Sequence, residues 1–320
     1  MIKPLLKELR HVLLHTLLAV TVWVLPHNLH FRAFRLIARL RWLIPVQTGL
    51  SSMLKHLPEL QPYRHSITLG HALHQIVDQA DYYLTHKYGN NWLKQNLQIE
   101  GRILSAHLAG KPAPVLLTPH YGQGFWALYY FRHVLGLPVA WLHLPPPAVS
   151  QLGQKLASRH GRKRIRRVEM LAGCRPIPTG GSIQAMQSCL QQGNAVLAMP
   201  DVPPAPSRSH LPISLVGRQA AIPAGTLQMA ARERAPVYMY TVYLDRSTGK
   251  RKLKLNGPYI GLSAEDLAAK FAEMLNTALS TDPAAWHLWP WIELFLGSEP
   301  ANKQGATQHC SGQGSNRQGK

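Results

Sequence analysis

The chain has 320 residues, with 35 Lys or Arg against 15 Asp or Glu, which gives a formal net charge of +20. This length allows a large α/β core, and the charge favours an anionic partner such as phospholipid headgroups, nucleic acid or an acidic carrier protein. Three cysteines without Cys-x-x-Cys spacing argue against a disulfide framework.

The first 45 residues contain two segments that predict membrane association. Residues 12–25 are apolar apart from His15, Thr16 and Thr21, a run shorter than the roughly 20 residues that a spanning helix needs. Residues 31–42 place Arg32, Arg35 and Arg39 among apolar side chains at three- and four-residue spacing, as in a basic amphipathic helix at a membrane interface. We therefore expect residues 1–45 to form hydrophobic, membrane-associated helices; an ordinary packed helix pair is the alternative.

Residues 50–100 have a helical pattern with an apolar face and a polar one. Within this stretch His71 and His74 are three residues apart, a spacing that metal ligands also use. No third ligand lies nearby in the sequence, so we predict that they bind no metal.

From residue 113 short apolar runs alternate with helical stretches, which predicts a single α/β domain over residues 46–300 with a mixed sheet flanked by helices. The expected strands are 114–118, 138–142, 195–199 and 237–244, and the expected helices are 125–134, 182–190 and 225–234.

The end of the domain is aromatic, and the tail after it is polar. Trp286, Trp289, Trp291 and Phe295 form a cluster that we expect to pack in the core or to line an acyl channel. Residues 301–320 contain no large aliphatic or aromatic side chain, which predicts a disordered tail.

Two polar residues follow predicted strands at their carboxyl ends, where open α/β sheets bind ligands. His120 follows Val115-Leu-Leu-Thr-Pro119, and Asp201 follows Val196-Leu-Ala-Met-Pro200. His120 in this place can act as a general base on a substrate hydroxyl or amine, and the chain has no Gly-x-Ser-x-Gly nucleophile motif. The alternatives are a histidine that caps the next helix and an aspartate that only bonds to its own turn.

The same segment also satisfies a dinucleotide-binding pattern, because Gly122, Gly124 and Ala127 follow a strand and enter a helix. That site requires an acidic residue about twenty positions further on for the ribose. The sequence has no Asp or Glu between Glu100 and Glu169, which makes a nicotinamide cofactor the less favoured reading.

Three blocks together resemble the lipid A lauroyl/myristoyl acyltransferases of the lysophospholipid acyltransferase superfamily. The block from His120 is similar to the family's His-x4-Asp/Glu signature, and Gly193 to Pro204 is similar to its strand, Pro-Asp and proline turn. Residues 216–237 resemble its Gly-Arg, Pro-x-Gly and Ala-Pro-Val elements. In order and spacing the resemblance covers residues 10–295.

The resemblance implies an acyltransferase at the cytoplasmic face of a bacterial inner membrane. His120 would deprotonate a hydroxyl or amine of a lipid-like acceptor, which attacks an acyl thioester. The donor would be an acyl carrier protein or acyl-CoA, and no cofactor or metal is implied. Main-chain N–H groups near Gly122 or Gly225, or an arginine, would stabilise the oxyanion.

The chain departs from the family at the residue five positions after His120, which is Phe125 instead of an acid. Asp201 would then supply the missing carboxylate from the neighbouring strand end. Alternatively, Tyr121, Gln123 or a main-chain carbonyl would orient a neutral imidazole; we also expect Tyr121 and Gln123 to contact the substrate. The third possibility is a catalytically inactive homologue that binds lipid or acyl chains.

Seven basic residues and no acid lie between Lys155 and Arg167, which favours anion binding over a merely solvated surface. We expect Arg164 and Arg167 to contact the substrate or an acidic carrier, and Arg218 of the Gly-Arg pair to contact the substrate. Nucleic acid is not predicted, because the run lacks interleaved aromatic residues for base stacking.

Overall fold

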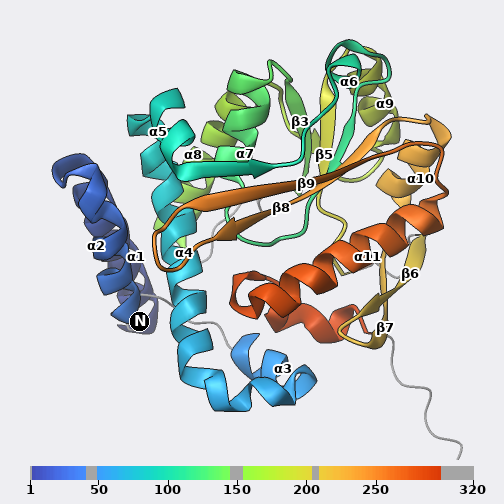
Figure 1. Cartoon of the computed structure of the whole chain (residues 1–320). Helices are drawn as coiled ribbons and strands as arrows, with labels where there is room; N and C mark the ends of the chain where they lie inside the picture. The colour runs from blue at the N-terminus through green and yellow to red at the C-terminus, as the bar shows by residue number, and fades with distance from the viewer. Residues whose placement is uncertain (1, 41–48, 145–153, 204–208, 297–320) are drawn as a thin grey trace, which may run out of the picture.

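A seven-stranded mixed sheet forms the centre of the protein (Figure 1). The computed structural model describes residues 2–40, 49–144, 154–203 and 209–296. Strands in this sheet have the order β1-β9-β8-β2-β5-β3-β4, and the β8–β9 pair is antiparallel while the other neighbours are parallel. Their bounds are β1 Leu97–Glu100, β2 Val115–Leu117, β3 Val139–His143, β4 Ile177–Pro178, β5 Ala195–Ala198, β8 Val237–Leu244 and β9 Arg251–Tyr259.

The central strands are continuous apolar runs because both of their faces are covered. Val115 and Leu117 of β2 join the hydrophobic cluster on one face of the sheet, whereas Leu116 between them joins the cluster on the other. Val237 and Tyr238 of β8 divide in the same way. Alternate side chains of each strand therefore pack into the two hydrophobic clusters on opposite faces of the sheet.

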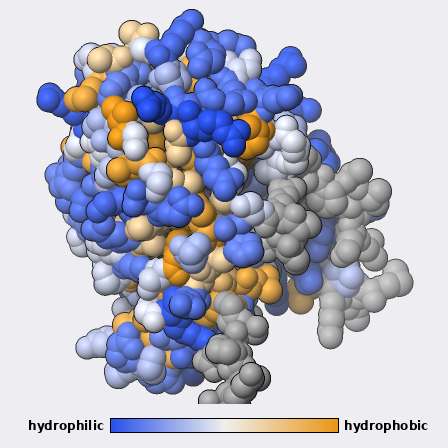
Figure 2. All heavy atoms as spheres, turned by 90° about the vertical axis from the view of Figure 1, so that its right-hand side faces the viewer, coloured by the Kyte–Doolittle hydropathy of each residue, from blue (hydrophilic) through white to orange (hydrophobic). Residues whose placement is uncertain are grey.

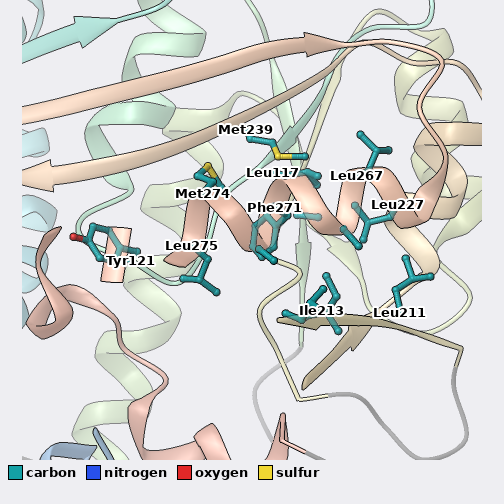
Figure 3. Packing of buried hydrophobic residues seen from close by; sticks show 14 of the residues in the cluster. Leu117, Tyr121, Leu211, Ile213, Leu227, Met239, Leu267, Phe271, Met274 and Leu275 are labelled. Atoms are coloured by element: carbon teal, nitrogen blue, oxygen red, sulfur yellow. The ribbon is translucent and has the colours of Figure 1, made fainter. Parts of the chain in front are cut away.

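One face is covered by helices from the second half of the chain, and Figure 3 shows Phe271 and Leu275 between the sheet and a short hairpin. A capping box formed by Ser263 and Asp266 starts α11. The elements on this face are α9 Ile183–Gln191, α10 Gly225–Arg232, α11 Ala264–Thr281, the hairpin β6 His210–Leu215 and β7 Arg218–Pro223, and the 3-10 helices η3 Pro283–Ala285 and η4 Trp289–Leu294.

The opposite face is covered by the long helix α4, and α1 and α2 pack against α4 on its outer side (Figure 1). The elements on this side are α1 Ile2–Val24, α2 His27–Arg39, α4 Arg64–Lys87, α5 Asn90–Asn96, α7 Phe125–Tyr129, the π-helical turn η2 Tyr130–Val134 and α8 Lys155–Ala172. Three further short helices complete the described chain: α3 Gly49–His56, η1 Pro58–Tyr63 and α6 Ser105–Ala109.

The structure confirms the mixed α/β class and every strand and helix that was predicted after residue 113, with ends shifted by at most two residues. It corrects residues 97–100, which were expected to be helical and instead form β1 beside β9. The strands β4, β6, β7 and β9 and the helices α8 and α11 were not predicted. The predicted disordered tail, residues 301–320, lies outside the described residues.

The amino-terminal helices contribute to the same core as the sheet. Leu18 of α1 and Phe34 and Ile37 of α2 are buried in the cluster that includes α4. This corrects the expectation that the apolar stripe of residues 31–42 faces a membrane, because two of its members pack against protein. No helix among the described residues combines the length and the apolarity that crossing a bilayer requires.

The other side of α1 is exposed and apolar. Its exposed large side chains are Leu5, Leu6, Leu9, Val12, Leu13, Leu17, Val20, Trp23 and Val24, with exposed fractions of 37–72%. At 100° per residue they occupy an arc of roughly 140°. We call these nine residues the α1 face. The helix α1 lies on the left in Figure 1, whereas the opposite side of the molecule, shown in Figure 2, is mostly hydrophilic with scattered apolar groups.

Three histidines join α1 to α8. The ring centroid of His15 lies 4.3 Å from that of His11 and 3.8 Å from that of His160, and the His15 Nδ1 lies 3.1 Å from the Tyr83 hydroxyl. Burial, together with the neighbouring imidazoles and Arg164, lowers the pKa of His15 to about 3. Burial and the same kinds of neighbour lower the pKa of His160 to about 4.

We expect acid to loosen the packing of α1 through these histidines. Their folded-state pKa values lie below the ordinary 6.5, so their contribution to stability is complete above pH 6.5 and is lost as the pH falls towards 4. The free energy of unfolding is measured by urea denaturation at pH 7.5 and at pH 5. Its fall between these two pH values should be about 1–2 kcal/mol smaller in His15→Gln than in the wild type. An equal loss in both proteins would show that His15 takes no part.

Candidate active site

The parallel pairing of β2 and β5 brings two polar residues together at one edge of the sheet. Leu117 of β2 is paired with Ala198 of β5, and the chain continues for three residues to His120 and to Asp201 respectively. Neighbouring strands lie about 4.8 Å apart, so residues at equivalent distances beyond a paired position come within contact.

His120 and Asp201 form a hydrogen-bonded pair. The imidazole Nδ1 lies 2.8 Å from Asp201 Oδ1, and the main-chain N–H of His120 donates to Asp201 Oδ2 at 2.7 Å. Asp201 is fully buried, while the side chain of His120 is 28% exposed. Because a carboxylate oxygen only accepts, Nδ1 carries the hydrogen, and the neutral ring keeps its lone pair on Nε2.

The charge of Asp201 favours the protonated form of His120. Burial lowers the pKa of His120, but the carboxylate charge and its hydrogen bond together outweigh burial, so the pKa is raised above its ordinary value. An imidazolium that forms at this position is therefore stabilised, as a general base requires.

Residues 285–287 pair with residues 120–122, which we call the His120 loop. Gly122 N–H donates to the Ala285 carbonyl at 3.0 Å, and His287 N–H donates to the His120 carbonyl at 2.9 Å. Between these bonds Tyr121 pairs with Trp286 as an antiparallel bridge. The indole N–H of Trp286 then reaches Asp201 Oδ2 at 2.9 Å.

This closure explains the first glycine of the apparent dinucleotide pattern. Gly122 has φ of +67°, and a Cβ atom there would lie 1.9 Å from the main-chain oxygen of Val242. Its carbonyl accepts a hydrogen bond from His287 Nε2 at 2.9 Å. The glycine thus permits a close approach of protein backbone, and both of its polar main-chain groups are already bonded within the protein.

Tyr121 and Gln123 make their hydrogen bonds away from the His120 ring. Both are buried; the Tyr121 hydroxyl donates to the Ala278 carbonyl at 3.0 Å, and Gln123 Nε2 donates to His74 Nδ1 at 3.0 Å. The orienting contact that they were candidates for is made by Asp201 instead. His74 Nε2 in turn contacts Asp282 Oδ2 at 2.9 Å, so both ring nitrogens of His74 have protein partners.

The position of the family's acid is apolar and enclosed. Phe125 is 3% exposed, and the guanidinium of Arg164 stacks 4.4 Å from its ring centroid. Arg164 Nη2 also donates to both carboxylate oxygens of Asp78 on α4, at 2.7 Å each. The charge of Arg164 is therefore balanced by Asp78 of α4.

The other predicted arginines also have protein partners. Arg167 donates to the Thr85 carbonyl on α4, so Arg164 and Arg167 both link α8 to α4 instead of projecting outward as we expected. Arg218 lies on β7, and its Nη1 is 3.2 Å from His56 Nδ1. The exposed cations of the basic run are Lys155, Arg159, Arg162, Lys163 and Arg166.

Two cavities lined by described residues lie away from His120. One of about 460 Å³ lies between α5, β1 and η2, and another of about 320 Å³ lies between α2, α5 and the β8–β9 turn. His120 lines neither of them. The imidazole of His120 is partly exposed where the sheet ends.

Sequence reasoning nominated His120 and Asp201 but missed Trp286 as a contact of the pair. Trp286 was assigned to an aromatic cluster, and no periodic pattern connects it with a strand end. A search against known protein families finds no matching family model, and a search of curated proteins finds no match to this chain.

Proposed function

We propose that the protein is an acyltransferase in which His120, oriented by Asp201, deprotonates a hydroxyl or amine of a lipid-like acceptor. The observation that carries this proposal is the 2.8 Å contact between His120 Nδ1 and Asp201 Oδ1, with the imidazole left partly exposed. In the proposed step Nε2 takes the acceptor's proton as the acceptor attacks the acyl thioester. The thiolate then leaves and receives that proton from the imidazolium.

The oxyanion of this reaction needs donors other than the main-chain N–H groups of residues 120–122. The N–H groups of His120, Tyr121 and Gly122 donate to Asp201, to the Pro119 carbonyl and to the Ala285 carbonyl respectively. This removes Gly122 from the expected oxyanion donors. The first turn of α10 at Gly225, or an arginine, remains as the proposed source.

We further propose that the α1 face lies in the interface of a bilayer that holds the acceptor. The buried face of α1 is fixed to the protein, and the nine exposed apolar residues are available to lipid. Exposed Arg32, Arg35 and Arg39 on the adjacent α2 complement anionic headgroups. The five exposed cations of α8 suit an acidic acyl carrier as donor better than they suit coenzyme A.

The experiment is a thiol-release assay with purified protein, an acyl-carrier thioester and bacterial lipid extract as the acceptor pool. We expect the wild type to release carrier thiol and to form an acylated lipid visible by mass spectrometry. His120→Gln removes the base and should reduce the rate by at least about 10³-fold.

His71→Gln is the matched control, because His71 is a partly buried histidine whose Nδ1 donates to the Ala284 carbonyl and which does not contact Asp201. It should retain most of the rate. Lipid binding without thiol release in the wild type would replace this proposal by the lipid-binding homologue.

A further inference from the structure

We infer that Trp286 is a positioning residue of the His120–Asp201 pair, whose indole N–H fixes the carboxylate with Oδ1 facing the imidazole. The effect of Trp286 on reaction rate rests on the proposed function. Its effect on the ionisation of His120 does not, because that can be measured without any substrate.

Three hydrogen bonds fix the orientation of the Asp201 carboxylate. Oδ2 of Asp201 accepts from the His120 main chain at 2.7 Å and from Trp286 Nε1 at 2.9 Å, and Oδ1 accepts from His120 Nδ1 at 2.8 Å. Rotation of the carboxylate about its own axis would break at least one of these bonds. Among the described residues, Trp286 thus supplies the side-chain donor on Oδ2, and it leaves Oδ1 for the imidazole.

The indole of Trp286 is held in place by burial and by contacts of its main chain and its ring. Trp286 is fully buried, and its main chain pairs with Tyr121, the residue that follows His120. Its ring also meets the ring of Trp289 edge to face, with centroids 4.9 Å apart. The indole therefore moves together with the His120 loop, and its N–H stays aimed at the carboxylate.

The hydrogen bond from Trp286 also changes the distribution of charge on the Asp201 carboxylate. A hydrogen bond to Oδ2 draws negative charge away from the rest of the carboxylate. Without it, Oδ1 holds the imidazolium more strongly, so the pKa of His120 should rise further above its ordinary value. The freed carboxylate should also orient the neutral ring less well, which slows the reaction.

The test compares Trp286→Phe with Trp289→Phe in the full-length protein. Both tryptophans are almost fully buried in the same cluster, but Trp289 Nε1 donates to the Pro283 carbonyl at 2.7 Å and not to Asp201. The pKa of His120 is read from the pH titration of its ring carbon signal by NMR, assigned as the signal absent from His120→Gln.

We expect Trp286→Phe to raise the pKa of His120 by about half a unit and Trp289→Phe to leave it unchanged. In the thiol-release assay Trp286→Phe should lower kcat on the order of tenfold and move the pH profile upward by the same amount. If Trp286→Phe does not fold, benzothienylalanine at position 286 keeps the ring shape and removes only the N–H.

The same pKa of His120 in the wild type and in both position-286 variants would overturn the inference. A shift of the pKa specific to position 286 supports it even if the wild type transfers no acyl group. In that case the proposed function fails while the positioning role stands.

Discussion

Asp201→Asn should reduce the rate of thiol release by about 10³- to 10⁴-fold while the protein remains folded. The amide can present an N–H to Nδ1 of His120, which would favour the ring tautomer that carries its hydrogen on Nε2 and has no lone pair there for the substrate. Replacing the analogous aspartate of a serine protease costs about 10⁴ in rate for the same reason. The rate is measured at substrate saturation across pH 6–9, together with the unfolding free energy.

The chain offers a chemically matched control for this variant. Asp282 also contacts a histidine, His74, at 2.9 Å, and it holds Arg246 as well. Asp282→Asn should lower the unfolding free energy and leave the rate within a fewfold of the wild type. Similar rate losses in the two variants would mean that Asp201 acts through stability and not through His120.

Replacing Leu9, Leu13 and Val20 together by Gln should weaken binding to phosphatidylglycerol vesicles on the order of 100-fold. These three residues lie on the α1 face with exposed fractions of 37–52%, and burying each partly in lipid contributes roughly 1 kcal/mol. Glutamine changes no charge, so electrostatic attraction to the anionic headgroups is kept. Binding is measured by co-sedimentation at constant ionic strength.

The control for this variant removes exposed apolar side chains from elsewhere on the surface. Val134, Ile260 and Leu294 are 49–60% exposed and lie outside α1 and α2. Their triple replacement by Gln should leave vesicle binding unchanged. Equal weakening by both triple variants would contradict a specific role of the α1 face.

The elements of the α/β domain could be predicted from the sequence because strands and helices differ in the spacing of apolar residues. The buried strands β2, β5 and β8 are continuous apolar runs and were found. β9 was missed because it alternates Lys252 and Lys254 with leucines, since one of its faces is partly open, and β4 has only two residues. Short or half-polar strands depend on their neighbours more than on their own composition.

The candidate site could be predicted only in part. His120 and Asp201 were recognised as residues at strand ends, but the sequence does not state that β5 lies next to β2, since β3 intervenes in the chain. Likewise, the charge count identified residues 155–167 as a basic run, but it did not show that they lie in a helix or that Arg164 and Arg167 turn towards α4. The contact of Trp286 depends on a distant segment that pairs with the His120 loop.

The central claim is that His120 acts as a base held by Asp201. It is tested most directly by single-turnover acyl transfer from a carrier thioester, measured between pH 5 and pH 9. The rate should rise with pH through an apparent pKa above 6.5, because Asp201 raises the pKa of His120, and His120→Gln should abolish the transfer. A rate that does not depend on pH in this range, or that survives in His120→Gln, would contradict it.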